Sequence, residues 1–245
     1  MVFIIHITVK YKYNLLNYFI MIKRYKVKGI EILEYNGYFE LENKEELEIM
    51  KVLIKIYQAF FNENDINYLQ SSSITFKGNK IVSLKKLLEK QELEYNLVLN
   101  LLHNIARLKE KLEENNLMFI NIELEDIIVL DSKKFIFINV NKIHELNIET
   151  GDIEIERIID KVSIFNPKEM KEEINKEIIP FKVNIKSVYY NIGNILLYSL
   201  LNTNIDDKNI SKIEEVLYPI YYTKLYWFLL RCLNKEPNDR VFLFI

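Results

Sequence analysis

Cysteine, glycine and proline are scarce in this sequence. The chain of 245 residues has one cysteine, Cys232, so it can form neither an intrachain disulfide nor a cysteine-based metal cluster. Its three histidines, His6, His103 and His144, are far apart, and no H-x-x-x-H or C-x-x-C pair occurs. We therefore predict no structural zinc, and we expect the reducing interior of a cell as its setting.

Long hydrophobic runs and an excess of one charge are also lacking. The apolar run over residues 2–9 is interrupted by His6 and is shorter than the ~20 apolar residues of a membrane span. The formal net charge of −2 gives no basic field that would attract nucleic acid or an anionic membrane surface. We predict a cytoplasmic protein that binds neither membranes nor nucleic acid, with Met1 and Met21 both open as the start of the chain.

The sequence does contain enough apolar material for a core. Hydrophobic residues make up 49% of the chain and charged residues 28%, as in a folded domain. Residues 24–82 combine strand patterns, with a hairpin turn at Asn36-Gly37, and a helical pattern over residues 44–61. We predict a small strand-rich unit here, preceded by an N-terminal extension over residues 1–23.

Residues 83–245 have mainly helical patterns. Ser83 is a good N-cap for a helix, and residues 93–116 have the clearest helical periodicity in the chain. Residues 187–201 and 217–233 are apolar on nearly every face, which predicts two buried helices. A mainly helical unit is therefore expected to follow the strand-rich one.

One strand pair is predicted inside this helical part. Residues 127–130 and 135–138 are short apolar runs rich in strand-forming residues, and polar residues 131–134 join them. Residues 139–185 show little pattern. The predicted fold class is α+β.

Four segments resemble motifs of the eukaryotic-type protein kinase family, in the family's order. Residues 119–130, FINIELEDIIVL, are similar to the catalytic loop H-R-D-L-K-P-E-N and its following strand, and residues 135–141, FIFINVN, to the strand that ends in D-F-G. Residues 186–193 are similar to the start of the family's buried central helix, and residues 231–240 to its late R-C-L-x-x-x-P-x-x-R motif. The resemblance covers residues 24–240.

The resemblance implies a bilobal protein kinase-like fold. Its reduced, strand-rich N-lobe would be residues 24–82, and its mainly helical C-lobe would be residues 83–245. The family usually has one more helix after the last motif, so the C-terminal end is expected to be truncated and to leave apolar surface exposed.

The same resemblance places residues without catalytic chemistry at the key positions. Asn121 stands where the family has its catalytic aspartate, Glu123 where it has a lysine, and Asn139 where D-F-G supplies a metal-binding aspartate. An amide cannot take up a proton, and losing a positioned base costs ~10²–10⁴ in rate. Asp126, at the position of the metal-binding asparagine, is the one acid left and the candidate nucleotide or metal ligand.

Features that hold nucleotide phosphates are also missing from the front of the chain. It offers Gly29 and Gly37 but no G-x-G-x-x-G, and Glu40 or Glu42 stands where a lysine is expected. No cofactor is predicted beyond the ATP and magnesium that the resemblance allows at Asp126. The glutamates of the following helix start, Glu45, Glu46 and Glu48, are expected to be solvated and to lack the family's usual cation.

Other matched positions are expected to be structural. The segment FNPKE is similar to the family's A-P-E motif, with its glutamate one place late, and the late arginine of the family pairs with that glutamate. The positions concerned, together with the glycine of the central helix, are Pro167, Glu169, Gly193, Pro237 and Arg240.

These features predict a catalytically inactive protein kinase-like domain that binds or regulates a protein partner. The aromatic stretch over residues 218–228 is either a partner surface or a core helix. One alternative is a divergent active kinase or nucleotide-binding phosphotransferase that uses Asp126 with another acid such as Glu123 or Glu125. A second alternative is an unrelated structural or interaction protein.

Overall fold

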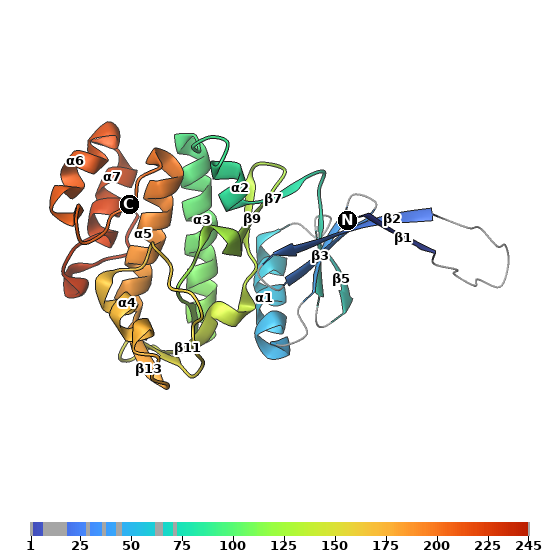
Figure 1. Cartoon of the computed structure of the whole chain (residues 1–245), viewed down its shortest axis with the longest axis horizontal. Helices are drawn as coiled ribbons and strands as arrows, with labels where there is room; N and C mark the ends of the chain where they lie inside the picture. The colour runs from blue at the N-terminus through green and yellow to red at the C-terminus, as the bar shows by residue number, and fades with distance from the viewer. Residues whose placement is uncertain are drawn as a thin grey trace.

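Helices and antiparallel sheets make up a mixed α+β structure in the computed structural model (Figure 1). Its described part contains seven α-helices and three sheets. The predicted α+β class is confirmed. The residues that the structure describes are 2–6, 19–27, 30–35, 38–42, 46–61, 66–70 and 73–244.

The front of the chain forms a six-stranded sheet with one helix. The strands are β1 (Val2–His6), β2 (Phe19–Val27), β3 (Ile30–Tyr35), β4 (Tyr38–Glu42), β5 (Ile66–Gln70) and β6 (Ser73–Lys77), in the spatial order β1-β2-β3-β4-β6-β5. Helix α1 (Leu47–Phe60) connects β4 to β5, and its Tyr57 ring lies 6.2 Å from that of Phe76 in β6. The helix predicted over residues 44–61 is confirmed, whereas the turn at Asn36-Gly37 lies outside the described residues.

A second sheet joins the front of the chain to the rest. β7 (Ile81–Ser83) pairs with β9 (Ile127–Leu130), which pairs with β10 (Lys134–Phe137). Ser83 then caps α2 (Leu84–Leu88), because its hydroxyl accepts a hydrogen bond from the Lys86 N–H at 3.3 Å. The predicted N-cap and the predicted hairpin are both confirmed.

The third sheet arises from the segment with little sequence pattern. It has the order β13-β12-β11-β8, built from β8 (Leu117–Phe119), β11 (Ile143–Asn147), β12 (Asp152–Ile155) and β13 (Phe181–Asn184). β12 alternates between buried isoleucines and less buried acidic residues, β11 does so less regularly because His144 is buried, and each is only four or five residues long. Such short strands give too few alternations for a period to be recognised.

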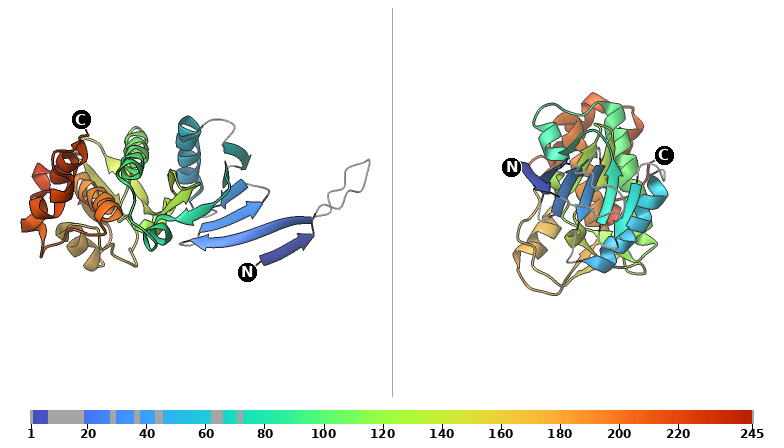
Figure 2. Two further views of the ribbon diagram at one scale, coloured as in Figure 1. Left: turned by 90° about the horizontal axis from the view of Figure 1, so that it is seen from above. Right: turned by 90° about the vertical axis from the view of Figure 1, so that its right-hand side faces the viewer.

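Helices pack at the end of the molecule opposite the six-stranded sheet (Figures 1 and 2). They are α3 (Tyr95–Glu113), α4 (Lys168–Asn175), α5 (Ile185–Leu201), α6 (Ile213–Leu217) and α7 (Lys224–Cys232). α5 is buried along most of its length and contacts both α3 and α7, as its apolar sequence predicts. Among the described residues, none of the helices combines the length and hydropathy needed to cross a bilayer.

The single helix predicted over residues 217–233 is wrong. The chain instead forms α6, a 3₁₀ turn over Tyr218–Ile220, and α7. Tyr222 has a positive φ of 66°, which ends any helix, and the Thr223 hydroxyl accepts from the Tyr226 N–H to begin a new one. Local capping therefore overrides the continuous apolar pattern.

The last residues fold back onto the helices. Phe242 contacts the rings of Tyr189 and Phe228, while Phe244 contacts Phe228 and His103. His103 is exposed on α3, as its helical spacing predicts. Two aliphatic side chains next to these phenylalanines remain exposed, so the expected exposure of apolar surface is only partly met: Val241 and Leu243.

Gly193 lets α5 approach the end of α7 closely. A Cβ atom at this position would lie 2.9 Å from the Cys232 Cβ and 3.3 Å from Leu233. We predict that Gly193→Ala lowers the free energy of unfolding by about 1–3 kcal/mol, because overpacking outweighs the ~1 kcal/mol by which alanine favours a helix. Urea unfolding of both proteins measures the difference. A variant as stable as the wild type would show that the two helices separate at little cost.

Candidate functional site

The candidate site lies in the loops that follow β8 and β10, where residues of the first two motif-like segments meet. The backbone after β8 forms a 3₁₀ turn over Leu124–Asp126, and Glu123 and Asp126 cap it reciprocally. Asn139 follows β10, and its Nδ2 donates to Asp126 Oδ1 at 2.7 Å. The predicted site residues Asp126 and Asn139 are therefore direct neighbours.

Asp126 is fully buried, and both oxygens of its carboxylate accept hydrogen bonds. Besides the bond from Asn139, Oδ2 accepts from the Glu123 N–H at 2.8 Å and from the Lys142 ammonium at 2.7 Å. A buried carboxylate needs such partners, because removing a charge from water is otherwise costly. The acid that the sequence leaves as its one candidate ligand is thus bound internally.

Lys142 is the functional residue that the sequence reasoning missed. It lies in the 3₁₀ turn Val140–Lys142 directly after the N-V-N segment, and its ammonium also donates to the Asn121 carbonyl oxygen. Its side chain is 16% exposed, so the ion pair with Asp126 is largely shielded from water. The sequence did offer one signal, because this lysine directly follows the N-V-N segment that contains the predicted site residue Asn139.

A magnesium ion does not fit these residues. Both Asp126 oxygens are engaged, and the one nearby cation is the covalently attached Lys142 ammonium. Asn139 presents its amide nitrogen to Asp126, and a neutral amide is a poor replacement for the second anionic ligand that magnesium prefers. Across the described residues, no group of three or more histidine, cysteine or acidic side chains could hold a metal.

Glu123, which stands at the place of a lysine in the resemblance, adds no uncompensated negative charge to the site. Its carboxylate lies 2.6 Å from the Lys161 ammonium and 3.6 Å from that of Lys142. Two carboxylates, Glu123 and Asp126, therefore face two ammonium groups. The local charge is therefore balanced. Both ammonium groups come from later segments of the chain.

Asn121 supports the structure of the site instead of carrying a base. Its φ is +52°, a left-handed conformation that asparagine tolerates better than most residues. The amide is buried, donates to the Lys161 carbonyl at 2.8 Å, and accepts from the Ser163 N–H at 2.7 Å and the Asn166 amide at 2.6 Å. Both the amide nitrogen and the amide oxygen of Asn121 thus hold residues 161–166.

A network of buried amides extends from Asn121 to α5. The Asn191 amide nitrogen donates to Asn166 Oδ1 at 2.9 Å, and Asn191 Oδ1 accepts from the Ile122 N–H at 3.2 Å. The Ser163 hydroxyl donates to the Ile122 carbonyl at 2.8 Å. A satisfied buried network of this kind fixes one arrangement of the loop.

An open groove of about 320 Å³ adjoins these residues. Asn121, Glu123, Asn139 and Lys142 line it, together with His144. The Asn141 Oδ1 atom is buried without a hydrogen-bond partner among the described residues. Both carboxylates closest to the Asn121 position are ion-paired, and the further acid that lines the groove, Asp160, is exposed to solvent on the loop after β12.

His144 is a weak base in this groove. Its side chain is 8% exposed, and burial, followed by the neighbouring Arg157 guanidinium, lowers its pKa from 6.5 to about 4 against the opposing effect of Glu46. The imidazole is therefore neutral at pH 7. A base this weak holds a proton poorly during catalysis at neutral pH.

The lowered pKa of His144 predicts a loss of stability in acid. The group stabilises the fold fully above the ordinary pKa of 6.5, and this contribution is lost as the pH falls from there toward 4. We expect His144→Gln to remove about 2–3 kcal/mol of the acid destabilisation between pH ~7 and pH ~4. Urea unfolding at both pH values measures it, and the exposed His103→Gln variant is the control. Parallel pH profiles for wild type and His144→Gln would contradict the assignment.

Glu46 is not simply solvated as expected, because it pairs with a cation, although not with the lysine that the family uses. Its carboxylate lies 2.6 Å from Arg157, which follows β12. Glu48 pairs with Lys51 on the same helix, and Glu45 lies outside the described residues. The sequence could not predict the first pair, because its members are 111 residues apart.

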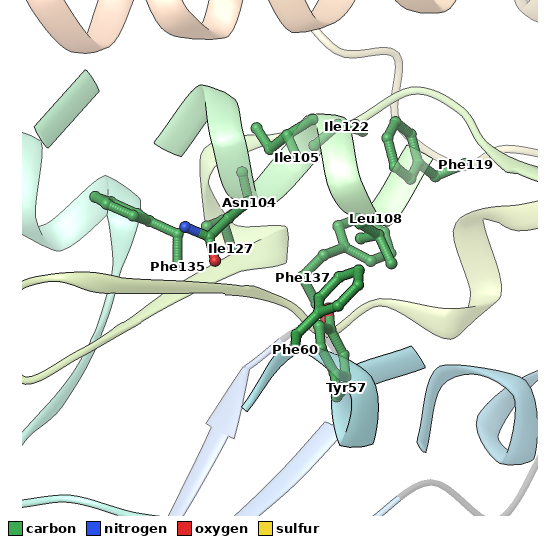
Figure 3. Close-up of a pocket in the computed structure, with 10 residues that line it drawn as sticks. All are labelled: Tyr57, Phe60, Asn104, Ile105, Leu108, Phe119, Ile122, Ile127, Phe135 and Phe137. Carbon is green, nitrogen blue, oxygen red and sulfur yellow. The ribbon is translucent and has the colours of Figure 1, made fainter. Parts of the chain in front are cut away.

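The C-terminal end of α1 packs next to the candidate site through apolar side chains, among them Tyr57, Phe60 and Phe137 (Figure 3). One buried hydrogen bond adds to this contact. The Tyr57 hydroxyl donates to the Phe137 carbonyl at 2.6 Å, and burial raises the tyrosine pKa well above its usual range. Phe119, at the position of the family's histidine, lies 5.5 Å from the Phe137 ring. Only about 10 Å³ of space remains among these side chains, so they form a packed wall.

The predicted structural positions lie on the helical side. Pro167 is the N-cap of α4, and Pro237 begins a 3₁₀ turn. The Arg240 guanidinium is buried and binds both oxygens of Glu169, one of which also accepts from the Ser187 hydroxyl at 2.9 Å. The structure thus brings Glu169 and Arg240 together.

The front of the predicted nucleotide site is described only in part. Gly29 and Gly37 lie outside the described residues, and the Glu42 side chain does as well. Glu40 is half-buried in β4, opposite Thr75 of β6.

Neither a scan against models of known protein families nor a search of curated proteins found a match to this chain.

Proposed function

We propose that this chain is a catalytically inactive protein kinase-like domain that acts by binding a protein partner. The observation that carries the proposal is the contact between Lys142 and Asp126. The acid that a metal-dependent kinase reaction would need is buried, hydrogen-bonded at both oxygens and neutralised by an ammonium of the same chain. Phosphoryl transfer depends on metal and charge stabilisation at this point.

The order of the elements supports the kinase-like part of the proposal. A helix connects two strands of the front sheet, a helical part follows, and the hairpin β9–β10 is inserted within it. The degenerate motif residues flank that hairpin, and Glu169 pairs with Arg240 in the way the family's A-P-E glutamate pairs with its late arginine.

The amide network supports the absence of catalysis independently. Asn121 uses both ends of its amide to hold residues 161–166, so it is a structural residue at the place of a base. Among the titratable groups that line the groove, His144 has a pKa of about 4, and Asp160 is exposed to solvent. The residues of this site therefore favour a binding role over a reaction.

A phosphoryl-transfer assay tests the proposal. Purified protein is incubated with radiolabelled ATP, magnesium or manganese, and casein as acceptor, beside a heat-denatured control. We expect no transfer above the control, either to casein or to the chain itself. Transfer that is well above the control and is lost in Asp126→Asn would overturn the proposal and establish a divergent kinase.

A thermal-shift titration with ATP and ADP adds an independent measurement. A ligand at about a thousand times its Kd would stabilise the fold by ~4 kcal/mol. We expect no stabilisation that depends on magnesium, because Lys142 occupies the position where the metal would neutralise Asp126.

A further inference from the structure

A trough lined by carboxylates runs along the four-stranded sheet, beside the candidate site. It consists of two adjoining cavities of about 440 and 870 Å³, which share Leu117, Glu145 and Glu154. One end reaches the first turn of α1 at Glu48, and the other reaches Glu149 after β11. We name this feature the acidic trough.

The acidic trough concentrates negative charge. Six carboxylates line it against two basic side chains, a local balance of −4 on a chain whose net charge is −2. The eight residues are Glu48, Glu145, Glu149, Asp152, Glu154 and Glu156, with Arg157 and Lys182.

Much of this charge has no internal partner. Glu145, Glu154 and Glu156 are exposed and form no ion pair with any residue in the described part of the chain. The pairing of Leu146 with Ile153 brings Glu145 and Glu154 opposite one another on adjacent strands, and Lys182 of β13 lies opposite Glu154 on its other side. This one lysine offsets only part of the negative charge, which suits an external cation.

His144 gives a second, independent indication of a ligand. This side chain is more than nine-tenths buried, lines the acidic trough as well as the groove beside Asn121, and makes no hydrogen bond within the described residues. Its ring nitrogens are absent from the buried, unpaired atoms of the described residues, so they face the open space that the side chain lines. Its neutral form can donate one hydrogen bond and accept another.

Aliphatic side chains also line the acidic trough. Ile49 and Val52 of α1, with Leu117 and Ile143, line the part nearest α1. The aliphatic stems of lysine and arginine pack well on such side chains while their charged ends reach carboxylates. The trough thus combines the two surfaces that a basic, partly apolar peptide requires.

We propose that the acidic trough binds an extended, lysine- and arginine-rich segment of a protein partner. The inference rests on the proposed role as a protein-binding module, and it names the surface and the chemistry of the partner. The occupant is a peptide and not a metal ion, since no suitable metal cluster exists among the described residues. Nucleic acids and anionic membrane surfaces would be repelled by the same carboxylates.

The test is fluorescence anisotropy with a labelled peptide in which arginine and leucine alternate, at low and at physiological salt. The trough variant is Glu145→Gln/Glu154→Gln/Glu156→Gln, which removes three exposed charges and leaves the side-chain shapes. The matched control is Glu92→Gln/Glu110→Gln/Glu236→Gln, which removes three exposed charges elsewhere. We expect the trough variant to bind roughly tenfold or more weakly and the control to stay within about twofold of wild type.

A third variant tests the contribution of His144 apart from the charge of the acidic trough. His144→Leu keeps every carboxylate, and we expect it to weaken binding by about threefold or more while melting curves confirm that it is folded. Equal weakening in the trough variant and the control would show general electrostatic attraction and would overturn the proposal. The absence of binding by wild type at millimolar peptide would do the same. Neither result touches the phosphoryl-transfer assay, so the two proposals fail separately.

Discussion

Replacing Lys142 by methionine is expected to lower the free energy of unfolding by about 3–5 kcal/mol. Asp126 has no exposed surface, and the Lys142 ammonium at 2.7 Å is its one cationic partner among the described residues. Without it the carboxylate keeps only two neutral donors, from Asn139 and from the Glu123 backbone. A buried charge left uncompensated is among the costliest results of a single substitution.

Two further variants separate this cause from a general loss of charge. Lys161→Met removes an ammonium from the same cluster, but Lys161 is 64% exposed, so we expect a loss of less than ~1 kcal/mol. Lys142→Met/Asp126→Asn removes both buried charges and should regain at least half of the loss. Urea unfolding at pH 7 compares all four proteins. Similar losses for Lys142→Met and Lys161→Met would contradict the buried ion pair.

The same residue allows a positive test of the proposal that the Lys142 ammonium takes the place of a metal ion at Asp126. In Lys142→Ala/Asn139→Asp, the internal cation is absent and a second carboxylate faces Asp126. We expect millimolar magnesium to raise the melting temperature of this variant, because two like charges in a buried site need a cation. Wild type should not respond. A variant equally insensitive to magnesium would show that more than Lys142 prevents metal binding.

Sequence patterns predicted the elements that are long or that carry a specific cap. The stripe of α3, the apolar length of α5 and the Ser83 cap all describe local physics, in which a helix needs only its own residues to be recognised. The hairpin β9–β10 was also predicted, because its two strands are almost entirely apolar and close together in the chain.

Elements that depend on distant contacts were missed. β12 and β13 are only four residues long, and each is held by a partner strand, so neither has a strong pattern of its own. The break before α7 depends on one cap at Thr223 and one backbone angle at Tyr222, which the apolar run of the sequence conceals.

For the candidate site, too, one part was predicted from the sequence and another was not. Motif spacing identified Asn121, Glu123, Asp126 and Asn139; the structure places three of them along one groove and Asp126 buried beside Asn139. Their partners could not be predicted, because Lys142, Lys161 and Ser163 reach the site through turns after β10 and β12. Position in a motif thus indicated which residues matter, while the network determined what they do.

Replacing Arg240 by methionine is the second large effect that we expect, a loss of about 2–4 kcal/mol in the free energy of unfolding. The guanidinium is 2% exposed, binds both oxygens of Glu169, and donates to the carbonyls of Asn234 and Lys235. It also lies 4.8 Å from the Tyr190 ring centroid. The loss is placed below that for Lys142 because Glu169 is 38% exposed, so water compensates part of it.

Arg240→Lys distinguishes geometry from charge at this position. Lysine keeps the positive charge but cannot make the two parallel bonds, so we expect it to retain less than half of the stabilisation. Arg231→Met is the control for losing a more exposed arginine, with an expected change below ~1 kcal/mol. A double-mutant cycle of Arg240→Met with Glu169→Gln should give a coupling above ~1 kcal/mol. A coupling near zero would mean that Arg240 acts through its backbone acceptors and the tyrosine ring, and that the pairing with Glu169 adds nothing to the fold.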